Sequence, residues 1–514
     1  MLRKGLLMVN EKTNRVNINN SPKYIKILLI SFLLLPLLTI SNYMNTDCIF
    51  LINMGKYISQ NGFFTTDPFT LHTGMASIAQ QWLADIIFYY TFKFLGAAGV
   101  VALVYAVFCL FEFLAFKLAS LVSSNFIVSW AVSLCAGFFM CRAFFVSRPQ
   151  IFTYILIVCE LLALAAFVKT KKIKFLAALP LISLVQINIH ASMWLMLFVI
   201  MLPYFADSIK INLKKIKKDP ECKFFPLAAA AALMFGAGFI NPYGIKAMTY
   251  LFTSYGYDII NKNIYEMKSP TVNDLDGKAF FFMIAVIVCS YIFYRKGTTR
   301  LRFFLLTAGT LYLGLSSMRS LAILFIASVP CLAYYFKDVK IMLSQSKQKI
   351  NKKMLARAGA VLCAITVAAL GVLAIPSQSG ENKDDFGKDD FYTSFNAITK
   401  VLDSEGGPEN VVIFNELTAG SYLELSGYKA YIDPRVELFL KDNNGQYDYL
   451  NEYFEAAYGK IYYKDFINKY DFTHLIIADS EPALLAGMEH DSDFKLIYED
   501  GHYKIFKNMK AKAE

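Results

Sequence analysis

The stretch QQWLADIIFYYTFKFLG (residues 80–96) decides how the rest of the chain is threaded. It is apolar on one face and carries Asp85 and Lys93, so its composition fits either a short crossing helix or a helix lying along a membrane surface. If it crosses a bilayer, every later apolar segment is inverted. The side on which the later polar residues lie therefore depends on this one segment.

Composition places the chain among polytopic membrane proteins. Of its 514 residues, 56% are hydrophobic and 18% are charged, and the mean hydropathy is +0.42. Soluble proteins have a larger charged fraction than this. The nine cysteines include no CxxC pair, which indicates neither a disulfide framework nor a zinc site.

About eleven apolar segments approach the length of a spanning helix, which needs roughly 20 apolar residues. We expect spans at about 26–43, 97–117, 125–141, 150–168, 174–190, 193–208, 225–240, 278–295, 302–316, 319–336 and 354–376. Residues 1–25 form a basic arm before the first span. No small-residue cleavage site follows that span, so we expect it to be an uncleaved helix.

The basic connectors decide how residues 80–96 lie. Positive charge gathers in the N-terminal arm and at 169–174, 210–218, 294–302 and 337–353. All five share the cytoplasmic side if 80–96 lies in the interface, whereas the arm conflicts with the other four if it crosses. We therefore predict an interfacial helix inside a long first outer loop (44–96) and a cytoplasmic N-terminus.

The residues after Pro376 are a different kind of sequence. They are predominantly acidic, whereas the whole chain has a net charge of +11. We expect a polar linker at 377–390 and a small extracytoplasmic α/β domain at 391–514. Strands are predicted at 410–415 and 474–480, with a hairpin in 494–506 that turns at Asp500-Gly501. The predicted fold is mainly α, a multi-pass transmembrane helix bundle (26–376) in the cell membrane followed by this domain.

With this topology, unusual polar residues gather on the outer face. They are Asp47, Asp67, Arg148, Asn188, His190, Tyr243, Glu266 and Arg319. Arginines neutralise and orient a phosphate, and a carboxylate can remove a proton from an attacking hydroxyl. This set therefore suits a reaction between an anionic lipid-linked donor and a hydroxyl acceptor.

Several of these residues also have a structural interpretation, and Asp47 could simply cap or solvate the end of the first helix. Asp67 in TTDPF starts a turn, and Tyr243 lies in NPYG, a turn by its chemistry. Arg148 could reach lipid headgroups, and His190 could simply be hydrogen-bonded at a helix end. In the tail, Asp433 and Arg435 in YIDPRVELF (431–439) could belong to a surface that covers the site or binds the acceptor, or could form a local salt bridge.

Several short motifs occur in a characteristic order along the chain. They are DCIFLINMG (47–55), DPFT (67–70), QWL (81–83), SRPQ (147–150), NIH (188–190), NPYG (241–244), KSP (268–270), AGSYL (419–423) and YIDPR (431–435). In kind and order they resemble a bacterial branch of the GT-C superfamily of integral-membrane glycosyltransferases. The chain departs from that branch in lacking an aromatic pair after the first Asp, and in having GSYL for GGYL and IDPR for IDGR.

The resemblance implies a glycosyltransferase that moves a sugar from a polyprenyl-phosphate donor to an envelope glycan, lipid or protein on the outer face. Asp47 occupies the position of the superfamily's catalytic acid, with Asp67 as a helper. We further expect phosphate contacts by Arg148 and Arg319, and substrate contacts by His190, Asn188, Glu266 and Tyr243. Some members use a divalent cation and others do not, so metal binding by Asp47 and Asp67 is left open.

A non-catalytic function is the alternative, either a flippase for lipid-linked saccharides or an envelope assembly partner. A transporter should carry ionisable residues near the midplane and often shows repeated halves. Glu112 and Glu160 fall within predicted spans, and the sequence has no internal repeat. We expect no nucleic-acid partner, because the positive charge lies in loops that flank the membrane.

Overall fold

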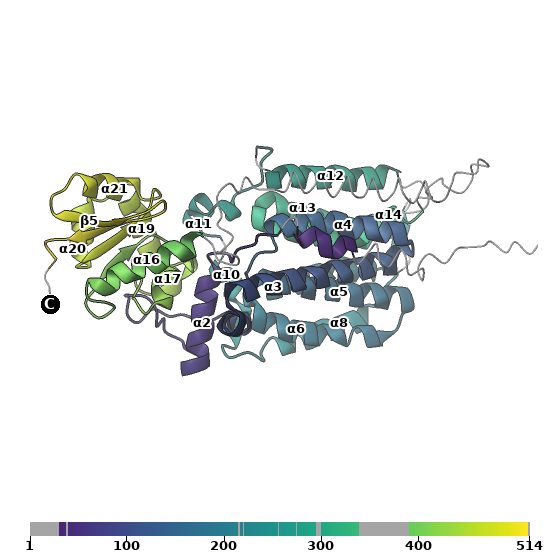
Figure 1. Cartoon of the computed structure of the whole chain (residues 1–514). Helices are drawn as coiled ribbons and strands as arrows, with labels where there is room; N and C mark the ends of the chain where they lie inside the picture. The colour runs from purple at the N-terminus through teal and green to yellow at the C-terminus, as the bar shows by residue number, and fades with distance from the viewer. Residues whose placement is uncertain are drawn as a thin grey trace, which may run out of the picture.

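The computed structural model describes residues 30–37, 40–213, 216–218, 220–254, 256–273, 275–293, 300–338 and 390–511. A bundle of aligned helices forms one end of an elongated molecule, and a small α/β domain forms the other (Figure 1). The predicted arm 1–25 and span 354–376 lie outside the described residues, as does nearly all of the predicted linker.

The bundle is made of long apolar helices. They are α3 (Trp82–Ser123), α4 (Phe126–Ala143), α5 (Gln150–Thr170), α6 (Ala178–Ile189), α7 (Trp194–Asp207), α8 (Phe224–Ala237), α12 (Leu275–Phe293), α13 (Leu301–Ser316) and α14 (Leu321–Tyr335). Every residue of α14 is buried, so this helix forms the centre of the bundle. A short hairpin, β1 (Ile211–Leu213) and β2 (Ile216–Lys218), follows α7.

Length and apolar composition allow three of the described helices to cross a membrane. They are Trp82–Ser123, Gln150–Thr170 and Met318–Tyr335, and further apolar helices in the described part are shorter. The prediction of a mainly helical chain with a small C-terminal α/β unit is confirmed. The number of spans and their orientation stay predictions.

A kink at Gly96 divides α3 into two helical parts. Gly96 has φ 66° and ψ −167°, a conformation that side-chain-bearing residues rarely adopt. The part before the kink contains most of the 80–96 segment and is seen end-on beside α2 in Figure 1, whereas the later part runs along the bundle. The predicted interfacial segment thus forms a helix that runs in a different direction from the rest of α3. Its position in a membrane stays a prediction.

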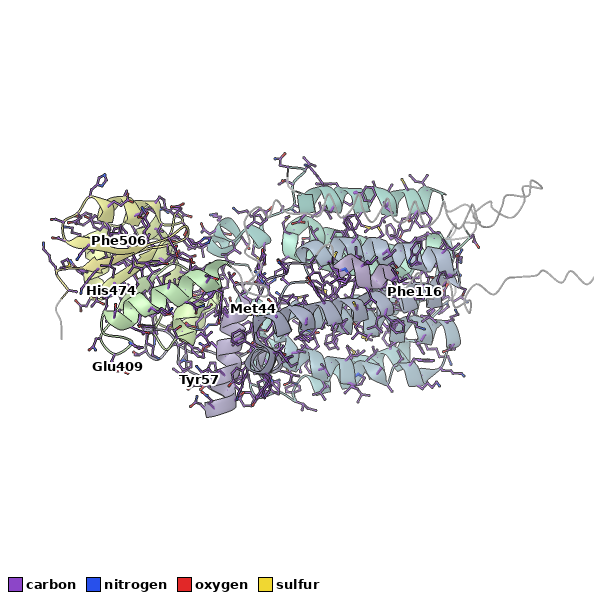
Figure 2. The ribbon with its side chains drawn as sticks, in the orientation of Figure 1. Met44, Tyr57, Phe116, Glu409, His474 and Phe506 are labelled. Carbon is purple, nitrogen blue, oxygen red and sulfur yellow. The ribbon has the colours of Figure 1, made fainter. Side chains whose placement is uncertain are left out.

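Helix α2 (Cys48–Asn61) lies across the end of the bundle that faces the α/β domain (Figure 1). Met44, which is fully buried, lies where the chain enters this junction (Figure 2). Gly55 allows α2 to contact the first part of α3 closely, because a Cβ at this position would be 2.2 Å from the carbonyl oxygen of Asp85. Short helices α9 (Ile245–Met248), α10 (Tyr250–Ser254) and α11 (Asp258–Asn263) complete this end.

The α/β domain contains a four-stranded sheet in the order β3-β4-β6-β5. Its strands are β3 (Ile413–Asn415), β4 (His474–Ile477), β5 (Phe494–Glu499) and β6 (Lys504–Asn508), and its helices are α16 (Asp390–Ser404), α17 (Ala419–Leu425), α18 (Lys441–Asn444), α19 (Tyr449–Ala457), α20 (Tyr463–Lys469) and α21 (Pro482–Glu489). β3 and β4 are parallel and the other pairs are antiparallel. The predicted hairpin turn is present, because the Asp500 carboxylate accepts hydrogen bonds from the backbone N–H groups of His502 and Tyr503, each at 2.8 Å.

Candidate functional site

Asp47, Arg148 and Glu266 form an ion-pair cluster between the bundle and α2. Asp47 is the residue before α2, Arg148 lies just before α5, and Glu266 lies in the 3-10 turn Tyr265–Met267. Arg148 Nη2 pairs with the Asp47 carboxylate, and Arg148 Nη1 donates to Glu266 Oε1 at 2.5 Å. The structure therefore brings together three of the side chains that the sequence analysis selected from distant loops.

The loop around Asp47 is held against the loop around Arg148 by further hydrogen bonds. The backbone N–H of Asn45 donates to Ser147 Oγ at 2.9 Å, and Arg148 Nε donates to Asn45 Oδ1 at 3.4 Å. The Asn45 amide oxygen also accepts from the Asp47 backbone N–H at 3.1 Å. Asn45, which the sequence analysis did not select, thus orients both partners of the ion pair.

Two carboxylates and one guanidinium leave this cluster with one excess negative charge, which the nearby Arg319 offsets. Burial alone would raise the pKa of Glu266, but the positive charges of Arg148 and Arg319 outweigh it and lower that pKa. Burial likewise opposes the charge of Arg148, and the neighbouring carboxylates raise its pKa. Side-chain exposure is 26% for Asp47 and 41% for Glu266, so a substrate group can reach both carboxylates.

Arg319 approaches the cluster from the turn before α14. The backbone N–H of Met318 donates to the carbonyl of Lys268 at 2.9 Å, which joins this turn to the segment that carries Glu266. The Arg319 charge acts on both Glu266 and His190. It is therefore the second cation on this side of the cluster.

His190 is buried at the end of α6 rather than exposed in the cluster. Its Nδ1 lies 2.9 Å from Thr153 Oγ1, and Gln186 Nε2 donates to its backbone carbonyl at 2.8 Å. The following residue, Ala191, donates its backbone N–H to the carbonyl of Gln80 at 3.0 Å. His190 thus lies where α6 meets the start of the 80–96 segment.

Asn188 and Tyr243 link the 80–96 segment to the NPYG turn. Asn188 Oδ1 accepts from Trp82 Nε1 at 2.9 Å, and its Nδ2 donates to the Ile240 carbonyl at 2.9 Å. The Tyr243 ring contacts Phe63 edge-to-face, with ring centroids 6.0 Å apart. Both side chains therefore hold neighbouring segments of the chain together.

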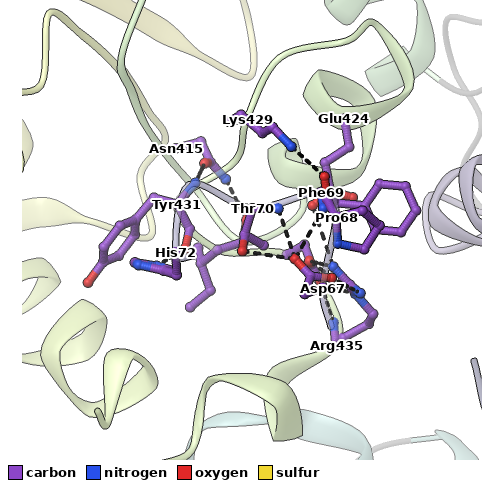
Figure 3. A network of polar contacts seen from close by, with 12 residues as sticks. Asp67, Pro68, Phe69, Thr70, His72, Asn415, Glu424, Lys429, Tyr431 and Arg435 are labelled. Carbon is purple, nitrogen blue, oxygen red and sulfur yellow. Dashed lines mark hydrogen bonds and ion pairs between the residues drawn. The ribbon is translucent and has the colours of Figure 1, made fainter. Parts of the chain in front are cut away.

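Asp67 lies in a different environment, buried against the α/β domain (Figure 3). Its Oδ1 accepts from Arg435 Nη1 at 2.6 Å, and its Oδ2 accepts from the Thr70 backbone N–H and Oγ1, each at 2.9 Å. Burial acts to raise the pKa of Asp67, but the Arg435 charge outweighs it and the pKa is lowered. The carboxylate is engaged by these partners, and the structure shows no direct contact between it and the Asp47 cluster among the residues described.

Arg435 is the centre of this second network. It pairs with Asp433 at 2.5 Å and lies 3.7 Å from Glu424, and all three side chains are at least nine-tenths buried. The Asp433–Arg435 pair was expected from the sequence, whereas the contact of Arg435 with Asp67 was not. Gly420 permits this packing, because a Cβ there would be 2.1 Å from the Ile432 carbonyl oxygen.

The loop after Asp67 extends this contact along the domain. Leu71 donates its backbone N–H to the Ala430 carbonyl at 2.9 Å, and His72 Nε2 lies 2.8 Å from the Tyr431 carbonyl (Figure 3). Gln446 Nε2 donates to the Thr73 carbonyl at 2.9 Å. The first outer loop is therefore anchored to the α/β domain on one side and, through Asp47, to the bundle on the other.

A narrow crevice opens beside the ion-pair cluster. It is lined by apolar side chains of the bundle, including Val101, Val104 and Phe145, and by the polar residues Asn45 and Ser147. Because these two polar residues adjoin Arg148, the crevice leads from an apolar surface to a cation. Within the described residues, no group of three or more His, Cys, Asp or Glu side chains is arranged to hold a metal ion.

Comparison with solved structures gives matches over nearly the whole chain. The oligosaccharyltransferase of Archaeoglobus fulgidus, tethered to an acceptor peptide containing the NVT sequon, superposes with a TM-score of 0.58 at 11% identity, covering 96% of this chain and 74% of that one. The mycobacterial arabinofuranosyltransferase AftD superposes with a TM-score of 0.54 at 12% identity, covering 95% of this chain and 41% of that one. The sequence matches no protein-family model and no curated protein. At these identities the similarity establishes a shared fold.

Proposed function

We propose that this chain, which has the GT-C glycosyltransferase fold, transfers a sugar from a polyprenyl-phosphate donor to an envelope acceptor on the outer face of the cell membrane. The observation that carries the proposal is the Asp47–Arg148–Glu266 cluster, in which a carboxylate that can accept a proton contacts a cation that can bind phosphate. The two structural neighbours are named as glycosyl-transferring enzymes, which supports the reaction class.

Asp47 is the general base of the proposed reaction. It accepts the proton of the acceptor hydroxyl while that oxygen forms a bond to the anomeric carbon of the donor sugar. The bond between that carbon and the donor phosphate breaks, and its electron pair stays on the phosphate. When the donor binds, Arg148 exchanges its ion pair with Asp47 for one with the phosphate, which frees the carboxylate for the proton.

Arg148 and Arg319 stabilise the leaving phosphate in this mechanism. Guanidinium groups bind phosphate through paired hydrogen bonds, and these strengthen as negative charge develops on the leaving group. The crevice lined by Val101, Val104 and Phe145 suits the first part of a polyprenyl chain, because it adjoins Arg148. Glu266, whose side chain is accessible, then borders the acceptor side, whereas the buried His190 supports the junction of α6 with the 80–96 segment. A divalent cation is not needed for this scheme, and Asp67 is assigned to loop anchoring.

The proposed topology places the cluster outside the cell. The N-terminus is cytoplasmic, the bundle 26–376 is multi-pass, and the domain 391–514 follows the linker 377–390 on the outer side. This orientation rests on the positive-inside distribution of the connecting loops. A lipid-linked donor in the outer leaflet could then enter the apolar crevice from the membrane.

One observation favours the alternative of a lipid-linked saccharide flippase. Both carboxylate oxygens of Glu112 in α3 and of Glu160 in α5 are buried and lack a hydrogen-bond partner among the described residues. Uncompensated carboxyl groups inside a helix bundle are typical of transport pathways. A flippase would move a labelled lipid-linked sugar between leaflets without transferring the sugar, so a leaflet assay separates the two functions.

Asp47→Asn tests the transferase proposal. The substitution keeps the side-chain size and removes the proton acceptor, so we expect loss of sugar transfer by about a hundredfold or more, within the usual range for a general base. Transfer is measured by mass spectrometry of lipid-linked sugars and glycans from a strain carrying only the variant. Asp258→Asn is the matched control, because Asp258 is an exposed outer carboxylate that pairs only with Lys262 across one helical turn in the described structure. Normal transfer by a folded Asp47→Asn protein would refute the proposal.

A further inference from the structure

A second crevice, of about 190 Å³, lies between α2 and the α/β domain. From α2 it is lined by Asn53, Lys56, Tyr57 and Gln60. Their spacing of i, i+3, i+4 and i+7 places the four side chains on one face of the helix. Gly55, which contacts α3, lies on another face, so α2 packs against the bundle and presents a separate polar and aromatic face to the crevice.

The α/β domain supplies the opposite wall. Tyr428 and Lys429 line the crevice from the loop after α17, next to Gly427, whose φ of 93° is strained for any other residue. Lys429 is exposed, and its Nζ donates to the Pro68 carbonyl, which holds the ammonium group at the edge of the crevice. Lys56 provides a second ammonium group from α2.

Aromatic rings form part of the same walls. Tyr57 contacts Phe69 edge-to-face, with ring centroids 5.3 Å apart, and both rings line the crevice. Tyr57 lies on α2 beside the α/β domain (Figure 2). Aromatic faces bind the apolar faces of sugar rings, while amide, hydroxyl and ammonium groups bind their polar substituents. The mixture is therefore suited to a saccharide more than to an apolar ligand.

The charge of the crevice is positive despite Glu424. Its side chain is 2% exposed and lies 3.7 Å from Arg435. Burial and the nearby Asp433 raise the pKa of Glu424, and the carboxyl lies beside the Arg435 guanidinium behind the crevice wall. Lys56 and Lys429 thus dominate the field that a ligand meets.

The crevice is connected to the ion-pair cluster by α2 itself. Asp47 precedes the first residue of this helix, and Lys56 lies about 13 Å further along it at 1.5 Å per residue. A chain of a few sugar units could therefore span from the crevice to Asp47. An acceptor held here would present its end to the proposed base.

We propose that the crevice between α2 and the α/β domain binds the acceptor, and that this acceptor is a saccharide bearing carboxylate or phosphate groups. Calling this ligand an acceptor rests on the proposed transferase function. The binding site itself rests on the lining residues Lys56, Tyr57, Phe69, Tyr428 and Lys429.

Binding is tested with the full chain in nanodiscs of zwitterionic lipid. The probes are trigalacturonate, its neutral methyl ester, and mannose 6-phosphate, each measured by calorimetry. We expect Lys56→Gln and Lys429→Gln each to weaken binding of the anionic probe by about fivefold, the upper range for an exposed ion pair. Lys460→Gln, which changes an exposed lysine elsewhere on the domain, should leave binding unchanged.

The outcomes separate this inference from the proposed function. Binding of trigalacturonate or mannose 6-phosphate that falls in the two lysine variants supports the site and identifies its anion. The inference is overturned if the methyl ester binds as tightly as trigalacturonate or if neither anionic probe binds. It is also overturned if neither lysine variant changes the affinity for the anionic probe. Asp47→Asn should still bind the probe while losing transfer. Retained transfer by that variant would refute the transferase function and leave the binding result standing.

Discussion

Replacing Arg435 should detach the first outer loop from the α/β domain. Arg435 pairs with Asp67 at 2.6 Å and with Asp433 at 2.5 Å, and Glu424 lies 3.7 Å away. The exposed fraction of the side chain is 9% for Arg435 and 0% for Asp67 and Asp433. Arg435→Gln leaves a polar but shorter side chain and removes the charge that compensates these buried carboxylates.

The expected cost follows from this burial. Removing one partner of a buried ion pair destabilises a protein by about 3–5 kcal/mol, because the remaining charge is left without compensation. Asp433 belongs to the same domain as Arg435, whereas Asp67 belongs to the first outer loop. Part of the cost therefore falls on domain stability and part on the contact between domain and loop. Protonation of the orphaned carboxylates at low pH should reduce the cost.

Hydrogen exchange of the full chain in detergent measures both effects. We expect faster exchange in residues 67–73 and 430–435 of Arg435→Gln, with unchanged exchange in α14 at the centre of the bundle. The amide N–H groups of Thr70 and Leu71 are direct reporters, because they donate to the Asp67 carboxylate and to the Ala430 carbonyl.

Two further variants show whether the effect comes from the buried pair. Adding Asp67→Asn to Arg435→Gln removes one orphaned charge, so the double variant should be less destabilised than the sum of the two single variants. Lys464→Gln removes a partly exposed ion pair elsewhere in the same domain and should leave exchange at residues 67–73 unchanged. Unaltered exchange there in Arg435→Gln, or strict additivity in the double variant, would refute the reasoning.

Two other predictions concern the α/β domain. Burial raises the pKa of Glu481 to about 7, so the folded domain binds a proton that the unfolded chain releases near its ordinary value of 4.5. This group therefore adds about 3 kcal/mol of stability at low pH that is lost as pH rises toward 7, and Glu481→Gln should flatten the pH dependence of thermal unfolding between pH 4.5 and about 7. An unchanged slope in that variant would contradict the assignment. Gly420→Ala should destabilise the domain by about 1–3 kcal/mol, because its Cβ would meet the Ile432 carbonyl oxygen at 2.1 Å. Gly501→Ala, where nothing lies within 4 Å of the added Cβ, is its matched control in the same thermal unfolding measurement.

Local sequence was sufficient for most of the secondary structure. Long apolar segments became the helices of the bundle, because their composition and length determine where they can be buried. The strands and the turn at Asp500-Gly501 lie where alternation and turn residues predicted them, since these signals act between residues close in sequence. Between β3 and β4 the chain forms the helices α19 and α20, which are separated by a turn containing Gly459 at φ 73°.

The sequence also selected the members of the ion-pair cluster, but it did not determine their contacts. Asp47, Arg148 and Glu266 were chosen because they are polar residues on the predicted outer face of the membrane. That face is predicted from the charge of the connecting loops alone. Asn45, which orients Asp47 and Arg148, had no distinguishing signal because an isolated Asn in a loop is common. Its function arises from the approach of two loops about a hundred residues apart.

The partner of Asp67 was decided only by tertiary structure. From the sequence, Asp67 was predicted to be a turn residue or a catalytic helper, and Asp433 and Arg435 were noted in the C-terminal domain. The sequence did not indicate that Arg435 contacts Asp67. Their pairing depends on how the first outer loop docks on the α/β domain, which is set by the summed packing of both surfaces rather than by either segment. By itself, the sequence determined which segments are apolar helices, which are strands and which side chains carry charge. Which of those charges meet across the docked surfaces was decided by the fold, because ion pairs between distant segments are a consequence of packing and not of local propensity.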